Sequence, residues 1–214
     1  MAQEILQEMS ALLQKGKAKD VKRLAQEALD QGIDPKEILN EGLLSGMMII
    51  GEKFKNNEVF VPEVLVAARA MSAGTKILEE KLMEAGVEPI GRVVIGTVKG
   101  DLHDIGKNLV IMMLKAAGFE VFDLGVDVDA DTYIDKAEEV NADIIGMSSL
   151  LTTTMPAMKE VIDAMKARGV REKYIVMVGG APVTQAYADQ IGADIYSEDA
   201  ATAAEKAKAA VLAK

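Results

Sequence analysis

The sequence predicts an α + α/β architecture, with an N-terminal four-helix bundle and a C-terminal flavodoxin-like (Rossmann-like) doubly wound parallel sheet of five strands. Two observations predict it. Helical periodicity with almost no strand-like run extends from Met1 to about Val87, and short β-branched runs then alternate with helical segments. The change falls at about residues 86–91, so we expect a helical domain over 1–88 and an α/β domain over 91–214.

Four amphipathic segments make up the helical half. They read EILQEMSALLQKG, DVKRLAQEALDQGI, DPKEILNEGLLSGMMIIGEKF and VPEVLVAARAMSAGTKILEEKLMEAG. Gly16 and Gly32 follow the first two as stop signals, while Asp34 and Pro35 suit the start of the third as N-cap and first helical residue. Four helices of this length form a small bundle.

The C-terminal half alternates strand and helix. Its apolar, β-branched runs predict strands at residues 92–98, 120–125, 142–149, 174–180 and 192–199. Helical segments are expected at residues 106–117, 130–140, 156–168, 184–191 and 200–213. Alternation at this spacing indicates a parallel sheet with helices on both faces. Short connections and right-handed crossovers make the flavodoxin-like doubly wound topology the natural one.

The composition limits the possible functions. The chain has 214 residues, a formal net charge of −10 and no cysteine. The charge argues against a nucleic-acid partner, since phosphate neutralisation needs clustered Lys and Arg. The absence of cysteine excludes disulfides, thiolate nucleophiles and Cys-ligated metals. The N-terminal stretch lacks the features of a signal peptide, and the longest apolar run, GLLSGMMIIG, is too short to span a bilayer. We therefore expect a soluble, cytoplasmic protein without a membrane partner.

The stretch GDLHDIGKNLV, residues 100–110, holds the only histidine. His103 lies between Asp101 and Asp104, ahead of Gly106, just beyond the first predicted strand. Open α/β sheets bind ligands at this edge. The two acids argue against a phosphate loop, and an aspartyl phosphorylation site would leave the histidine unexplained. A metal-ligating histidine commonly donates its second ring N–H to a carboxylate, here Asp101. A solvated loop histidine is the plain alternative.

Three separated motifs resemble those of cobalamin-binding domains. DLHDIGKN resembles the D-x-H-x-x-G motif, in which the histidine replaces the cofactor's own base below cobalt. GMSSLLTTTM, residues 146–155, resembles the family's S-x-L-x-T segment, and VGGAPVT, residues 178–184, resembles its Gly-Gly segment. All three lie at the carboxyl ends of predicted strands, in the family's order. Taken alone, the glycines would be a strand-end turn and the threonines a helix N-cap cluster.

The resemblance implies a base-off, His-on cobalamin, with His103 as the cobalt ligand and the nucleotide tail in a slot of the α/β domain. It implies that Asp101 orients His103 and that Thr154 extends this pair, in place of a serine in methionine synthase. The cofactor-binding positions carried over from the three motifs are Asp101, His103, Asp104, Gly106, Ser148, Leu150, Thr152, Thr154, Gly179 and Gly180. Ser148 is expected to hydrogen-bond the buried base and Thr152 the corrin or nucleotide. Gly179 and Gly180 would let the tail pass closely.

The segment GEKFKNNEVFVPEVLVAARAM, residues 51–71, resembles the helical cap of methionine synthase and of corrinoid methyltransferase proteins. Phe54, Val61 and Val64 fall on cap positions that cover the upper corrin face. Without the resemblance they would be ordinary core residues of a helix–loop–helix junction. The resemblance implies an apolar lid that excludes water and oxygen between turnovers and moves aside for each partner.

A helical cap joined to a cobalamin domain resembles the stand-alone corrinoid proteins of methylotrophic methyltransferase systems. This implies a methyl carrier more than an enzyme. A substrate-specific methyltransferase would load cob(I)alamin from a methylamine, methanol, betaine or aryl methyl ether. A second methyltransferase would then unload methylcob(III)alamin to tetrahydrofolate or coenzyme M, and a reductive activator would rescue cob(II)alamin. The alternatives are a small subunit of an adenosylcobalamin mutase, a cobalamin-based sensor and a cofactor-free flavodoxin-like regulator.

Overall fold

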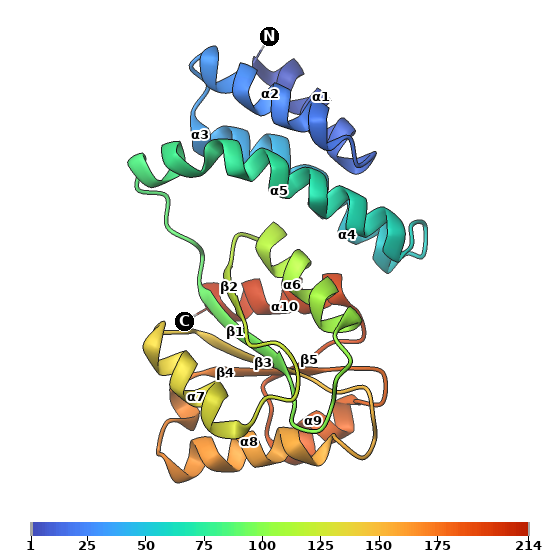
Figure 1. Ribbon diagram of the computed structural model, residues 1–214, viewed down its shortest axis with the longest axis vertical. Helices are drawn as coiled ribbons and strands as arrows, with labels where there is room; N and C mark the ends of the chain where they lie inside the picture. The colour runs from blue at the N-terminus through green and yellow to red at the C-terminus, as the bar shows by residue number, and fades with distance from the viewer. Residues whose placement is uncertain (1, 214) are drawn as a thin grey trace. The chain divides into compact units, whose positions relative to one another are not determined.

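The computed structural model describes residues 2–213 and separates the chain into two compact units, Met1–Glu88 and Pro89–Lys214 (Figure 1). The first is entirely helical and the second is an α/β sheet, as the sequence predicts. Each unit has its own core and is described by itself. No helix formed by residues 2–213 is both long and apolar enough to cross a membrane.

The helical unit consists of four helical segments. Their bounds are α1 Ala2–Gln14, α2 Ala18–Asp30, the run α3 Pro35–Glu37, η1 Ile38–Leu44 and α4 Ser45–Lys55, and α5 Val61–Glu84. Asp34 caps the third segment by accepting a hydrogen bond of 2.7 Å from the backbone of Lys36. The π-helical turns of η1 widen this segment, which the 3.6-residue periodicity of the sequence does not reveal. Fully buried Met9, Leu13, Leu43 and Met47 contribute to the core.

The α/β unit contains a five-stranded parallel sheet. Its elements are β1 Arg92–Thr97, α6 Ile105–Ala116, β2 Glu120–Asp123, α7 Ala130–Glu139, β3 Ile144–Ser148, α8 Pro156–Ala167, the 3₁₀ turn η2 Arg171–Lys173, β4 Ile175–Gly179, α9 Gln185–Ile191, β5 Ile195–Tyr196 and α10 Ala200–Leu212. The strand order is β2-β1-β3-β4-β5, which is the flavodoxin-like order. The predicted fold class is therefore confirmed.

The last strand is much shorter than the predicted run 192–199. Gly192 ends α9 in a left-handed conformation, and Asp199 already caps α10 by accepting a hydrogen bond from the backbone of Thr202. Only Ile195–Tyr196 pair with β4 between these two helix ends.

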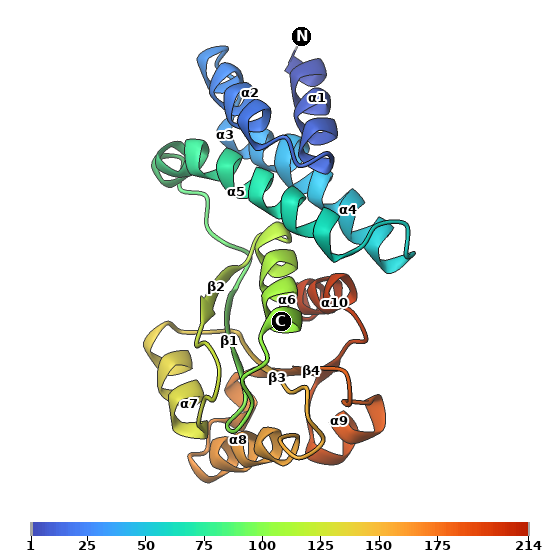
Figure 2. The same cartoon turned by 45° about the vertical axis from the view of Figure 1, so that its right-hand side comes forward.

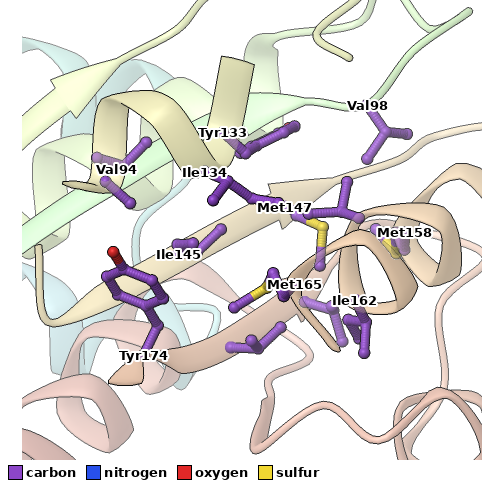
Figure 3. Close-up of a cluster of buried hydrophobic side chains, with 14 of the residues drawn as sticks. Val94, Val98, Tyr133, Ile134, Ile145, Met147, Met158, Ile162, Met165 and Tyr174 are labelled. Atoms are coloured by element: carbon purple, nitrogen blue, oxygen red, sulfur yellow. The ribbon is translucent and has the colours of Figure 1, made fainter. Parts of the chain in front are cut away.

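Helices cover both faces of the sheet (Figures 1 and 2). Helices α7, α8 and α9 lie on one face, where aliphatic and methionine side chains such as Met147, Met158 and Met165 form a buried cluster (Figure 3). Helices α6 and α10 pack against each other on the opposite face. The chain passes from β1 to α6 on one face of the sheet and from β3 to α8 on the other. The carboxyl ends of these adjacent strands therefore form the switch point where such sheets bind ligands.

Candidate functional site

The loops that follow β1 and β3 meet at the switch point. Asp101 lies in the first loop and Thr154 in the second, and their side chains are hydrogen-bonded although 53 residues separate them in the sequence. The register that brings the loops together pairs Thr97 with Ser148 at the ends of the two strands. The parallel sheet therefore joins two of the three predicted motifs into one site.

The carboxylate of Asp101 is the centre of this site and is completely buried. Its Oδ1 accepts hydrogen bonds from the backbone nitrogen of His103 at 3.0 Å and from Nδ1 of the same residue at 2.7 Å. Its Oδ2 accepts from the backbone nitrogen of Leu150 at 2.7 Å, from that of Leu151 at 3.3 Å and from the Thr154 hydroxyl at 2.8 Å. Both oxygens of a buried anion are thus satisfied.

These hydrogen bonds keep Asp101 ionised. Burial by itself raises the pKa of the Asp101 carboxyl, because it penalises the charged form. The bonds from the backbone of His103 and Leu150, and then those from the imidazole and Thr154, outweigh burial and hold this pKa well below its usual range. An ionised carboxylate only accepts hydrogen bonds, so Nδ1 of the imidazole carries a proton, and in the neutral ring this leaves Nε2 as the nitrogen with a lone pair for a ligand.

The hydrogen-bonded chain continues beyond Thr154. The Thr154 Oγ1 lies 2.8 Å from the hydroxyl of Ser149, and the Ser149 hydroxyl lies 3.1 Å from the carbonyl oxygen of Leu151. Both hydroxyl groups are buried, so this part of the network is shielded from water. The network fixes the position of the carboxylate, and through it the position of the imidazole.

The imidazole of His103 is held by Asp101 on its buried side, and its other side is exposed to solvent. The hydroxyl of Thr97 donates a 2.8 Å hydrogen bond to the carbonyl oxygen of His103, so the loop backbone is anchored to the sheet, while the side chain is 52% exposed. Leu102 and Ile105 are 72% and 73% exposed, and Leu150 is also exposed. Exposed aliphatic side chains around one open ring nitrogen suit a large apolar ligand that carries a metal.

The other predicted residues lie at the rim. Asp104 is exposed and accepts a hydrogen bond of 3.1 Å from the side chain of Asn108, and Gly106 opens onto free space in the first turn of α6. Ser148 ends β3 and is half-buried, whereas Thr152 is exposed. Their roles toward a ligand stay predictions.

The side chains at this site suit a metal ion that is already coordinated by a cofactor and needs one further ligand from the protein. Within residues 2–213 no group of three or more His, Cys, Asp and Glu side chains is placed to hold a metal ion. One imidazole whose second nitrogen is bonded to a carboxylate can supply a single, well-oriented axial ligand. Cobalt in a corrin ring needs only that from the protein below the ring, so the residues fit the group.

Comparison with known proteins gives the family. Residues 91–205 match the family model described as the B12 binding domain, and residues 5–79 match a second model with the same description. The chain is 49% identical, over 99% of its length and 98% of the relative's, to dimethylamine corrinoid protein 1 of Methanosarcina mazei. It belongs to the B12-binding corrinoid proteins. A corrinoid protein of Desulfitobacterium hafniense is 43% identical over 97% of both chains.

Solved structures agree with this assignment. The chain superposes with a TM-score of 0.87 on a chain of the methanol:cobalamin methyltransferase complex MtaBC of Methanosarcina barkeri, at 31% identity, covering 99% of this chain and 81% of that one. A cobalamin-binding protein of Desulfitobacterium hafniense gives a TM-score of 0.79 at 32% identity, over 95% and 97% of the two chains. This corrinoid protein therefore binds cobalamin, in the fold that its relatives share.

The two glycines of the third motif differ in their surroundings. Gly180 has a φ of +132°, and a Cβ atom built on it would lie 1.8 Å from the carbonyl oxygen of Ser149. Glycine is therefore needed at position 180 because the loop after β3 passes so close to it. The predicted passage of the tail is a second reason. A Cβ on Gly179 would meet only the carbonyl oxygen of Ser197, at 3.7 Å, so this position has room for a small side chain.

We therefore expect Gly180→Ala and Gly179→Ala to differ in their effect on the stability of the folded protein. Gly180→Ala should lower the free energy of unfolding by about 1–3 kcal/mol or more, which is the cost of a strained backbone conformation. The added Cβ would also collide with the backbone of Ser149, which cannot move without disturbing the loop after β3. Gly179→Ala should change it by less than about 1 kcal/mol. Urea unfolding of the two apoproteins measures the difference. Equal stability of the two variants would contradict this explanation of Gly180.

The predicted lid residues lie near the junction of α4 and α5. Phe54 and Val61 are half-buried, whereas Val64 is fully buried and has no surface free for a ligand in this conformation. Truncating Val64 would therefore leave a cavity and disturb packing. The lid assignment stays a prediction, and Phe54 is the residue that tests it best.

Two features of the site lie outside the residues predicted from the motifs. Ser149 extends the network from Thr154, although the family motif draws attention to Ser148. Lys107, within the first motif, is buried and bonded through Nζ to Asp123 at 2.6 Å and to Asn108 at 3.0 Å. Its spacing from buried Ile111 places it on the inner face of α6, and this helical spacing could have identified it.

Proposed function

We propose that this corrinoid protein is a methyl carrier. Its cobalamin would take a methyl group from a substrate-specific methyltransferase and pass it to a second methyltransferase. The observation that carries the proposal is the buried network of Asp101, His103 and Thr154 at the switch point, in a chain 49% identical to a dimethylamine corrinoid protein over nearly its whole length. The helical unit, which matches a B12-binding model of its own, favours a carrier over a mutase subunit.

The protein's own residues hold and protect the cofactor. Bound cobalamin supplies the chemistry of accepting and donating a methyl group. His103 would ligate the cobalt through Nε2, and Asp101 would fix the tautomer and the orientation of the ring. Thr154 and the backbone of Leu150 hold the carboxylate, and Phe54 and Val61 would cover the opposite side of the corrin.

A methylated amine is the methyl donor that we favour among methylamines, methanol, betaines and aryl methyl ethers. Three relatives named as dimethylamine corrinoid proteins are 47–49% identical over 96–99% of this chain. The chain of the methanol:cobalamin methyltransferase complex is only 31% identical. The second methyltransferase would transfer the methyl group to tetrahydrofolate or coenzyme M. A reductive activator would reduce the cobalt again after it had been oxidised.

A methyl-transfer assay tests the proposal. Reconstituted protein with reduced cobalt should be methylated slowly by dimethylamine alone and much faster when a dimethylamine-specific methyltransferase is present, as followed by the visible spectrum of the cofactor. Methanol with its own methyltransferase is the comparison for the donor. Preferred binding of adenosylcobalamin together with isomerase activity in a complex would contradict the carrier, as would specific DNA binding.

Phe54→Ala tests the lid. We expect it to leave the cobalamin content nearly unchanged, because the contacts below the corrin remain, and to speed photolysis and oxidation of the bound cofactor by opening the upper face. Met83→Ala, an exposed residue near the other end of α5, is the matched control. If Phe54→Ala protects the reduced cofactor as well as the parent protein does, Phe54 is not part of a lid.

A further inference from the structure

The hydroxyl of Ser197 is buried and has no partner. Within residues 2–213 only two buried side-chain oxygen or nitrogen atoms lack a hydrogen bond, the hydroxyls of Ser197 and Tyr133. Ser197 as a whole is 8% exposed. An unpaired buried hydroxyl is unfavourable for the folded protein, and each such group in a native structure calls for a specific explanation.

Ser197 lies in one row with residues already assigned to the site. At the carboxyl ends of the strands, Thr97 pairs with Ser148 and Ser148 with Gly179. Tyr196 pairs with Val178 on β4, so the next residue, Ser197, stands beside Gly179. The 3.7 Å between the carbonyl oxygen of Ser197 and a Cβ built on Gly179 confirms that the two are neighbours.

This row points away from the cluster in Figure 3. Val178 belongs to that cluster and Tyr196 packs against it, on the face covered by α7, α8 and α9. Successive residues of a strand point to opposite faces, so Gly179 faces α6 and α10. Ser197 directly follows Tyr196 beside Gly179, and continuing the same alternation places it on that face as well. The Tyr133 hydroxyl differs, because it lies against Gly96 within the opposite layer.

The helix opposite Ser197 offers little side-chain volume. All buried residues of α10 are alanines, namely Ala200, Ala201, Ala203, Ala204 and Ala207. With Gly179 on the sheet, this side of the layer is built from small groups. Few van der Waals contacts would therefore be lost if α10 moved away from the sheet to admit a flat ligand between them.

We propose that Ser197 is a specificity-determining contact for the nucleotide tail of the corrinoid, and that its hydroxyl forms a hydrogen bond to a polar atom of the tail once the tail lies between the sheet and α10. The proposal rests on the cobalamin binding of this family and adds the residue that directly follows β5, which none of the three sequence motifs includes. Ser148 and Ser197 then flank Gly179, one hydroxyl on each side. The tail is recognised by hydrogen bonds as well as by shape.

The proposal predicts opposite effects of one substitution on the apoprotein and on binding. Ser197→Ala removes an unpaired hydroxyl, so the apoprotein should unfold at the same or a higher urea concentration than the parent. The same variant should bind hydroxocobalamin about 2- to 13-fold more weakly, the range for one hydrogen bond between neutral groups. Its affinity for cobinamide, which has the corrin ring but no nucleotide tail, should be unchanged.

Titration of the full-length apoprotein with the two corrinoids, followed by visible spectra, measures both affinities. Ser10→Ala is the matched control, because Ser10 is equally buried at 8% but its hydroxyl is hydrogen-bonded to Ser45 in the helical unit. It should lose stability and keep both affinities. Equal weakening of hydroxocobalamin and cobinamide by Ser197→Ala would overturn the tail contact, as would unchanged affinity for both. Failure of the parent to bind either corrinoid would instead contradict cobalamin binding itself.

Discussion

His103→Ala is expected to abolish the imidazole-ligated spectrum of the bound cofactor. The affinity for cobalamin should fall, and methyl transfer should fall by more than the about 10- to 100-fold typical of changes behind a metal ligand. The reason is that His103 is the only imidazole of the chain, so no neighbouring histidine can substitute. Some cofactor should remain, because Ser148, Gly179 and the rest of the tail slot are unchanged.

Exogenous imidazole provides the control for this variant. The space left by the half-exposed side chain lies beside an intact Asp101 carboxylate, which can hold free imidazole by the same hydrogen bond. Added imidazole should therefore restore part of the parent spectrum. A His103→Ala protein with the parent spectrum and the parent transfer rate would show that the ligand below cobalt is not His103.

Asp101→Asn is expected to reduce cobalamin affinity or methyl transfer by about 10- to 100-fold. The two carboxylate oxygens accept five hydrogen bonds, and an amide has only one oxygen to accept them. If the amide nitrogen replaces Oδ1, it faces the backbone N–H of His103 and forces Nδ1 to accept, which puts the proton on Nε2. If it replaces Oδ2, it faces the backbone N–H of Leu150.

Either orientation leaves buried donors facing each other, so the apoprotein should also lose about 1–3 kcal/mol of stability for each unsatisfied donor. Asp129→Asn is the matched control. Asp129 is an exposed N-cap of α7 in the same unit, and asparagine caps helices as well as aspartate does. Asp101→Asn with the affinity, transfer rate and stability of the control would contradict the orienting role of Asp101.

The sequence predicts the framework of this molecule well, because that framework depends on local periodicity. The change from helical to alternating pattern identifies both units, and the alternation predicts the parallel sheet. His103 and Asp101 are two residues apart, so their hydrogen bond can be predicted from the local sequence. Only the order of the family's motifs indicates Thr154, because two helices and two strands, α6, β2, α7 and β3, lie between it and Asp101 in the sequence.

The remaining features depend on tertiary structure that no single motif encodes. The backbone N–H groups of Leu150 and Leu151 reach Asp101 only through the path of the loop after β3. The need for glycine at position 180 arises from the backbone of Ser149, which approaches it in space. The Ser197 hydroxyl lacks a hydrogen-bond partner because of its tertiary surroundings, which the sequence around it does not reveal.

Ligation of cobalt by His103 is tested most directly by electron paramagnetic resonance of the cob(II)alamin state. Because the chain has one histidine, growth on nitrogen-15 histidine labels a single imidazole. The account predicts a nitrogen superhyperfine splitting that changes to the nitrogen-15 pattern in the labelled protein. A nitrogen splitting that is unaffected by the label would show that the cofactor's own base, and not His103, occupies the lower position.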